Sequence, residues 1–155
     1  MATKEQLEAA AMLAARDLGV ATILFRNTIA KALNLNLTES LCLTLLGIKG
    51  RLAPSQLSRL IGLTTGSVTA MIDRLEKKNY VIRKANSADR RGIAVELTDH
   101  YRKQSRSIVQ NVQKAHKELM QSYSETELSV IAGFLNKFTL NLINNSGDVR
   151  FMFGT

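Results

Sequence analysis

Two adjacent arginines and one acid stand within the segment NSADRRG, residues 86–92, between the apolar runs YVI and IAVEL. A hairpin needs only two residues to turn, so we expect this longer segment to form a loop that extends beyond its strands. Guanidinium groups on such a loop suit a narrow A·T-rich minor groove, where the negative potential of DNA is concentrated. Asp89 fits this role if it accepts hydrogen bonds from loop N–H groups or an arginine and so orients Arg91. Arg90 is then a phosphate contact or a solvated side chain, and an ordinary solvated loop is the simpler alternative.

Residues that could support catalysis or hold a metal form no recognisable arrangement in this sequence. There is no nucleophile with a nearby base and no cluster of carboxylates, and GLTTGSVT lacks the lysine of a phosphate-binding loop. One cysteine with His100 and His116 cannot make a Cys/His zinc cluster. Cys42 lies in the apolar run SLCLTLLG, so we expect it in the core, because a redox sensor needs an accessible thiol near cations. The sequence therefore predicts neither an enzyme nor a cofactor.

Positive charge is concentrated in the middle of the chain. The formal net charge is +8 over 155 residues. Residues 51–106 hold twelve lysines and arginines against five acids, whereas residues 1–50 hold five against four and residues 107–155 four against four. A localised basic field is the electrostatic signature of a protein that binds a polyanion. A surface charge that served only solubility would be scattered along the chain.

Helical signals cover most of the sequence. Apolar residues recur at three- and four-residue steps, and capping residues precede them. We expect helices over residues 3–36, 39–50, 54–61, 64–80, 99–123 and 124–145, with caps at Thr3, Thr38, Thr64 or Thr65, Thr98 and Ser124. Ser124 and Glu127 form a capping box, as do Thr3 and Gln6. The class is therefore mostly α.

The middle of the chain has the order of a winged helix-turn-helix. Pro54 suits a first helical turn, Gly62 suits a helix end, and a second helix follows. The apolar period then changes to two in YVIRKA and GIAVELT, which predicts a two-stranded β-hairpin. A helix-turn-helix followed by a hairpin makes an α+β domain whose second helix fits the major groove of double-stranded DNA.

The second helix of this motif divides into two faces. Val68, Ile72 and Leu75 predict its buried face, so small polar residues at its start lie outward, where they can reach base edges or phosphates. Plain solvent-exposed surface is the alternative. The predicted DNA-binding residues are Ser55, Gln56, Thr64, Thr65, Gly66, Ser67, Thr69, Ala70, Arg74, Lys77, Arg83, Lys84, Asp89, Arg90 and Arg91.

Two strings in this region resemble the MarR family of bacterial and archaeal transcription regulators: VTAMIDRLEKKNYVIR, like the family's recognition helix and first wing strand, and SADRRGIAVELT, like its wing. The resemblance places the family's Asp-x-Arg on Asp89 and Arg91 and covers most of the chain. It implies an obligate homodimer that binds a pseudo-palindromic operator, usually as a repressor. It also implies release by a small, often phenolic or anionic, effector or by cysteine oxidation. The family's oxidised cysteine lies near the start of the first helix, where this chain has none.

Three positions depart from the family pattern without threatening the fold. Ala53 replaces the usual Thr or Ser before the proline, so that helix has a weak cap. Asn79 replaces a glycine, and asparagine also tolerates the left-handed conformation. LTDHYRK stands where members often have Leu-Thr-Glu-Lys-Gly.

The chain is expected to divide into a helical dimerisation region, residues 1–36 and 107–155, and a winged helix-turn-helix DNA-binding domain, residues 37–106. The first and last helices carry more apolar surface than one small winged helix needs, which independently indicates an interface. Arg16 and Arg26 could bind an anionic effector, but solvation or pairing with Asp17, Glu39 or the partner is the stronger interpretation. We expect a cytoplasmic protein with no membrane association. A winged-helix protein-interaction module and an architectural DNA binder without a specific operator are the alternatives.

Overall fold

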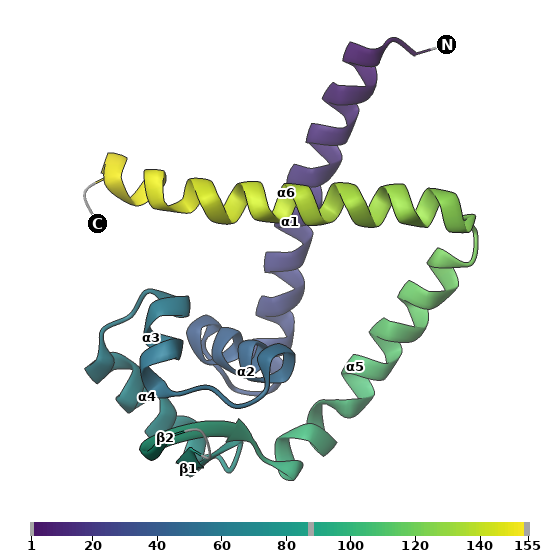
Figure 1. Cartoon of the computed structure of the whole chain (residues 1–155). Coiled ribbons are helices and arrows are strands. Elements are labelled where there is room, and N and C mark those ends of the chain that lie inside the picture. Colours follow the sequence, from purple (N-terminus) through teal and green to yellow (C-terminus); the bar gives the residue numbers. More distant parts are fainter. Residues whose placement is uncertain (1, 87–88, 154–155) are drawn as a thin grey trace. The chain divides into compact units, whose positions relative to one another are not determined.

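The computed structural model describes residues 2–86 and 89–153, with the side chains of all of these except 86, 89–91 and 146–153. The elements are α1 (Lys4–Ala32), α2 (Leu37–Lys49), α3 (Pro54–Ile61), α4 (Thr65–Lys77), β1 (Val81–Asn86), β2 (Asp89–Leu97), α5 (Asp99–Met120) and α6 (Glu125–Phe153), as Figure 1 shows. The expected class, mostly α with one β-hairpin, is confirmed. The chain forms two compact units, residues 1–104 and 105–155.

The first helices begin at capping boxes, and one of the two differs from the prediction. Thr3 and Gln6 cap α1 as expected. The cap of α2 is Asn36 rather than Thr38: the Asn36 side chain accepts from the Glu39 N–H at 2.8 Å, and the Glu39 carboxylate accepts from the Asn36 N–H at 3.2 Å. This pair satisfies two helix N–H groups, which Thr38 could not do from inside the first turn. Helix α1 ends at Ala32, short of residue 36, because Asn34 adopts a left-handed φ of 51°.

The core of the first unit forms between α2, α3, α4 and the hairpin. The predicted inner face of α4 is confirmed, since Val68, Ile72 and Leu75 are each fully buried. Leu57 of α3 and Val95 of β2 are also fully buried. The apolar face of α4 is therefore fixed against the body of the domain, and its opposite face is left outside.

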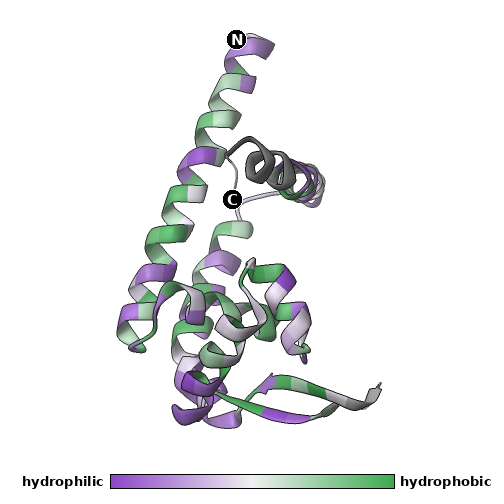
Figure 2. Cartoon of the chain, turned by 90° about the vertical axis from the view of Figure 1, so that its left-hand side faces the viewer, coloured by the Kyte–Doolittle hydropathy of each residue, from purple (hydrophilic) through white to green (hydrophobic). Residues whose placement is uncertain are grey.

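The hairpin is longer than predicted. Strands β1 and β2 pair antiparallel from Val81 with Leu97 to Ala85 with Ile93, and the register then shifts so that Asn86 pairs with Asp89. The expected seven-residue loop over 86–92 is therefore wrong, because both strands continue into it. The shift lets extra β2 residues bulge from the ladder, as irregular hairpins commonly do. Figure 2 shows the hairpin extending away from the helices of its unit.

The last two helices also begin at predicted caps. The Thr98 hydroxyl accepts from the Tyr101 N–H at 3.2 Å, which starts α5. Ser124 and Glu127 form the expected capping box, in which the Glu127 carboxylate accepts from the Ser124 N–H at 2.7 Å. Helix α5 ends at Met120, before the predicted residue 123. Helix α6 continues beyond the predicted residue 145, to Phe153.

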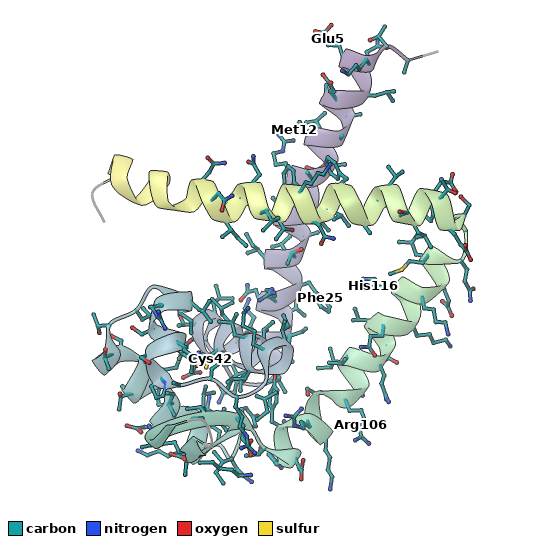
Figure 3. The ribbon with its side chains drawn as sticks, in the orientation of Figure 1. Glu5, Met12, Phe25, Cys42, Arg106 and His116 are labelled. Atoms are coloured by element: carbon teal, nitrogen blue, oxygen red, sulfur yellow. The ribbon has the colours of Figure 1, made fainter. Side chains whose placement is uncertain are left out.

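Helices α1 and α6 each carry many exposed apolar side chains. Figure 2 shows hydrophobic residues recurring along α1, and Figure 3 labels Met12 and Phe25 there. On α1 the exposed large apolar residues are Leu7, Met12, Leu13, Leu18, Val20, Ile23, Leu24 and Phe25. On α6 they are Val130, Ile131, Phe134, Leu135, Leu140, Leu142 and Ile143. Among the described residues, no helix combines the length and apolarity that crossing a lipid bilayer requires.

Candidate nucleic-acid interface

The start of α4 presents a small, polar and open surface. The Thr64 hydroxyl caps the helix by accepting from the Ser67 N–H at 3.2 Å, and it donates to the Ser67 hydroxyl at 2.9 Å. The Thr69 hydroxyl donates to the Thr65 carbonyl at 3.0 Å. A methyl group built on Gly66 would meet no protein atom within 4 Å. Six predicted DNA-binding residues of this surface are all exposed: Thr64, Thr65, Gly66, Ser67, Thr69 and Ala70.

The turn before α4 sets the position of that surface. Gly62 has a left-handed φ of 77°, which a glycine adopts without the steric cost of a side chain. Its N–H donates to the Ser58 carbonyl at 2.9 Å, and the Ser58 hydroxyl donates to the Leu63 carbonyl at 2.5 Å. These bonds join the end of α3 to the residue before the α4 cap. The approach of α4 is therefore fixed by a short, hydrogen-bonded turn.

The predicted residues of α3 are exposed, and one of them also has a structural task. Ser55 and Gln56 both lie on the surface. As predicted, Ala53 supplies no side-chain cap to α3. The Gln56 side-chain carbonyl instead accepts from the Ala53 N–H at 2.7 Å. The start of α3 is therefore stabilised by Gln56 despite the missing hydroxyl.

Basic side chains at the end of α4 have different surroundings. Lys77 is exposed. Arg74 Nε donates to Glu39 Oε1 of α2 at 2.8 Å, while half of the Arg74 side chain stays exposed. Lys78 Nζ lies 3.6 Å from Glu39 Oε2 and donates to the Asn34 carbonyl at 2.5 Å. Burial raises the pKa of Glu39, but hydrogen bonds from Arg74 and the Asn36 N–H and the two nearby positive charges outweigh it and hold the pKa below 4.5. Glu39 is therefore an ionised, almost fully buried group beneath α4.

The predicted basic residues of β1 are held by acids of the same domain. Arg83 donates to Asp73 at 2.6 Å and also to Glu76, both on α4. Lys84 Nζ lies 2.5 Å from Glu96 Oε1, and Arg51 pairs with the same carboxylate. The hydrogen bond from Lys84 is the main cause that lowers the pKa of Glu96, and Arg51 adds to it. Ion pairs thus join β1 to α4.

The three predicted wing residues lie at the start of β2. Asp89 begins β2, and the next two residues continue it. The side chains of Asp89, Arg90 and Arg91 lie outside the described residues. The hydrogen bonds expected at Asp89, from loop N–H groups or from an arginine, therefore stay a prediction.

Glu39 has other partners than the sequence suggests. The sequence offers it as one possible partner of Arg16 or Arg26, whereas the structure pairs it with Arg74 and Lys78. Arg16 lies 3.6 Å from Asp17, as one expected pairing had it. The only local signal at Glu39 is its place three residues after Asn36, which marks a capping box and says nothing about α4.

Cys42 lies in the core, as predicted. Figure 3 labels it among the packed side chains of the winged helix, and its exposed fraction is 0%. Burial, assisted by the negative charge of Glu39, raises the pKa of the thiol to about 12. A thiol in these surroundings is protonated at neutral pH and unreactive. Within the described part of the chain, no three His, Cys, Asp or Glu residues are grouped so that they could hold a metal ion.

A helix-turn-helix, a basic hairpin and an exposed small-residue surface at the start of its second helix define a winged helix-turn-helix of the DNA-binding class. The MarR family profile matches residues 35–93. The uncharacterized HTH-type transcriptional regulator YcgE of Bacillus subtilis (strain 168) is 33% identical over 135 residues, which are 87% of this chain and 88% of that protein. The HTH-type transcriptional regulator MhqR of the same organism is 33% identical over 107 residues, 69% of this chain and 74% of that protein. The chain belongs to the MarR family and is a transcription regulator.

Solved structures agree in fold. A MarR family protein from Bacillus stearothermophilus superposes with a TM-score of 0.67 at 18% identity, over 92% of this chain and 99% of that one. Apo wild-type MarR from E. coli superposes with a TM-score of 0.56 at 22% identity, over 89% and 97% of the two chains. At these identities the likeness concerns the fold alone.

Proposed function

We propose that this regulator is a homodimer that binds a pseudo-palindromic DNA operator, acts as a repressor, and is released by a small-molecule effector. In this proposal α4 enters the major groove and the wing enters the adjacent minor groove. The observation that carries it is the open surface at the start of α4, from Thr64 to Ala70, opposite a fully buried apolar face. A side of the helix built from small residues lets the backbone approach base edges closely.

Phosphate contacts would come from the basic side chains around that surface. Lys77 is exposed on α4, and Arg74 keeps half of its side chain exposed beside it. Arg83 and Lys84 already bind acids, so their contacts with DNA would require them to share or exchange those partners. We therefore expect the exposed Lys77 to contribute more to phosphate binding than the two β1 residues.

The dimer is supported by the apolar faces of α1 and α6. Fifteen large apolar side chains on these helices are exposed in the single chain. Covering such a side chain is worth up to about 1.5–3 kcal/mol, so an uncovered set of this size favours association. A two-fold axis would place the two copies of α4 about 34–36 Å apart, which is one turn of DNA. The sequence boundaries proposed for the dimerisation region, 1–36 and 107–155, remain our proposal.

The effector would be a small phenolic or anionic molecule, the ligand class that the family resemblance implies. Buried Cys42 does not fit the alternative of release by oxidation. The effector itself is best identified after the operator, since the regulated genes indicate the pathway. We expect the regulator to act in the cytoplasm, where the DNA is.

The test is selection of bound fragments from genomic DNA, followed by titration of the selected duplex and a random duplex by fluorescence anisotropy. We expect a clear preference for a short palindrome and an affinity that falls steeply with added salt. Equal affinity for both duplexes would favour an architectural DNA binder. No binding to any duplex at low salt would favour a protein-interaction module.

A matched pair of lysine substitutions tests the placement of α4. Lys77→Ala should weaken binding to every duplex and reduce the slope of log affinity against log salt by about one, because one phosphate contact is lost. Lys117→Ala removes the same charge from an exposed position on α5 and should leave the slope unchanged. Equal effects of the two substitutions would contradict the proposed orientation.

A further inference from the structure

We infer that Glu39 is a positioning residue for operator binding, which holds the Arg74 guanidinium in the orientation that meets a DNA phosphate and fixes the end of α4 on α2. This inference rests on the proposed function, since it assigns to Glu39 a part in the same DNA interface. Glu39 does not itself reach the surface: 4% of its side chain is exposed.

Both carboxylate oxygens of Glu39 have partners within the domain. Oε1 accepts from Arg74 Nε at 2.8 Å, and Oε2 accepts from the Asn36 N–H at 3.2 Å and lies 3.6 Å from Lys78 Nζ. A carboxylate that has left water is stabilised only by such partners, so it cannot rotate away without a large penalty. Because Asn36 and Glu39 also form the α2 capping box, the carboxylate is anchored to the backbone of its own helix.

The bond to Glu39 determines how Arg74 is presented. Glu39 holds the Nε edge, and the two terminal nitrogens of the guanidinium carry the remaining donors. Ala70, Arg74 and Lys77 lie four and three residues apart on α4, so they share one side of the helix. The exposed half of Arg74 is therefore on the side where we place DNA. A planar fork whose orientation is already fixed loses less conformational freedom when it binds a phosphate.

The same cluster ties the recognition helix to the residues after α1. Lys78 Nζ donates to the carbonyl of Asn34 at 2.5 Å, and Asn34 has the left-handed φ that ends α1. Glu39 thus lies between two cations, Arg74 of α4 and Lys78 just after it, and two asparagines of the α1–α2 link. Loss of its charge would release both the guanidinium and the end of the helix that bears it.

Two other roles for Glu39 lead to different expectations. If the acid only reduced the positive potential, its removal would strengthen binding to all DNA alike, since the net charge would rise by one. If it only stabilised the fold, its removal would lower thermal stability, and a folded sample would bind normally. A positioning role predicts that the preference for operator over random DNA is lost in protein that is still folded.

The experiment uses the full chain with Glu39→Gln, which keeps the shape of the side chain and removes its charge. Affinities for the selected operator and for a random duplex are measured at one salt concentration, below the thermal midpoint. We expect operator affinity to fall on the order of tenfold, the size of one charge-assisted hydrogen bond. Random-duplex affinity should stay the same or rise. Glu118→Gln makes the same charge change at an exposed position on α5 and should preserve the preference.

Arg74→Lys provides a test in which Glu39 stays intact, should Glu39→Gln fold poorly. Lysine keeps the positive charge but lacks the fork that binds Glu39 and phosphate together. We expect a loss of preference similar to that of Glu39→Gln. The double variant Glu39→Gln/Arg74→Lys should lose no more than Glu39→Gln alone, because Arg74 is oriented by its bond to Glu39.

The outcomes separate this inference from the proposed function. A wild-type chain with no preference for any selected duplex would contradict the proposed function, whatever the variants do. A wild-type preference that survives in both Glu39→Gln and Arg74→Lys, or losses that add in the double variant, would overturn the inference alone.

Discussion

Cys42 and Glu39 are close along α2 and differ in how burial affects them. The thiol is only a weak hydrogen-bonding group, and burial with the nearby negative charge of Glu39 raises its pKa to about 12, so it stays neutral. The carboxylate is just as removed from water but keeps its charge, because two cations and a backbone N–H stabilise it. Burial alone therefore does not decide the charge of a side chain, and the partners within reach do.

The Cys42 thiol gives a pH prediction. The folded thiol stays protonated up to about pH 12, whereas in the unfolded chain it ionises near its ordinary pKa of 9.0. The folded state therefore binds more protons between these values, so the thiol's contribution to stability is complete below pH 9 and is lost as pH rises toward 12. Urea unfolding at several pH values should show that the free energy of unfolding of wild type falls relative to that of Cys42→Ala as pH rises above 9. A constant difference would mean that the thiol is not buried in solution.

At the scale of elements, α4 combines a buried inner face with exposed small residues at its start. Its start is kept open by Gly66, and its end is tied by Glu39 on one side and by Arg83 on the other. These ion pairs involve the C-terminal half of α4, which carries its charged residues. The start of the helix is thus left free for contact with base edges, while its end is held in place by ion pairs.

Gly66→Ala separates the stability of α4 from its contact with DNA. The glycine is helical and has open space around it, so alanine should raise the free energy of unfolding by about 0.5–1 kcal/mol. The added methyl faces the proposed major groove, so operator affinity should fall while stability rises. Denaturant unfolding and operator titration on the same sample measure both. A Gly66→Ala chain with full operator affinity would show that this point of α4 stays clear of DNA.

Local signals in the sequence predict most of the helices and strands. They do not predict which residues far apart in the chain pair with each other. Capping boxes and the apolar face of α4 depend on residues within one or two turns, so they could be predicted. The Asn36 cap was missed because Thr38 offers an equally good local signal. The Glu39–Arg74 bond joins residues 35 apart in the chain, and no spacing rule connects them. The extension of β1 and β2 depends on pairing across the hairpin, which turn residues alone do not determine.

At the scale of the whole molecule, the apolar faces of α1 and α6 predict the oligomeric state. Leu135→Glu places a charge among the exposed apolar residues of α6 and should convert a dimer of 17.1 kDa chains into monomers, as sedimentation equilibrium would measure. Operator binding should weaken with it, because the two half-sites are then bound independently. Asn136→Asp adds the same charge at the next residue, an exposed polar position, and should leave the dimer intact. A Leu135→Glu chain that remains dimeric would place the interface elsewhere.

The ion pairs within the winged helix have a consequence for the counterions of DNA. Each phosphate that a cation neutralises releases condensed ions into solution, and the number released sets how binding responds to salt. Arg51, Arg74, Lys78, Arg83 and Lys84 already have carboxylate partners in the unbound protein. Binding to DNA through Arg51, Lys78, Arg83 or Lys84 would exchange one ion pair for another, and Arg74 would share its charge between Glu39 and a phosphate. We therefore expect the number of ions released on binding to be smaller than the count of basic residues in 51–106 suggests.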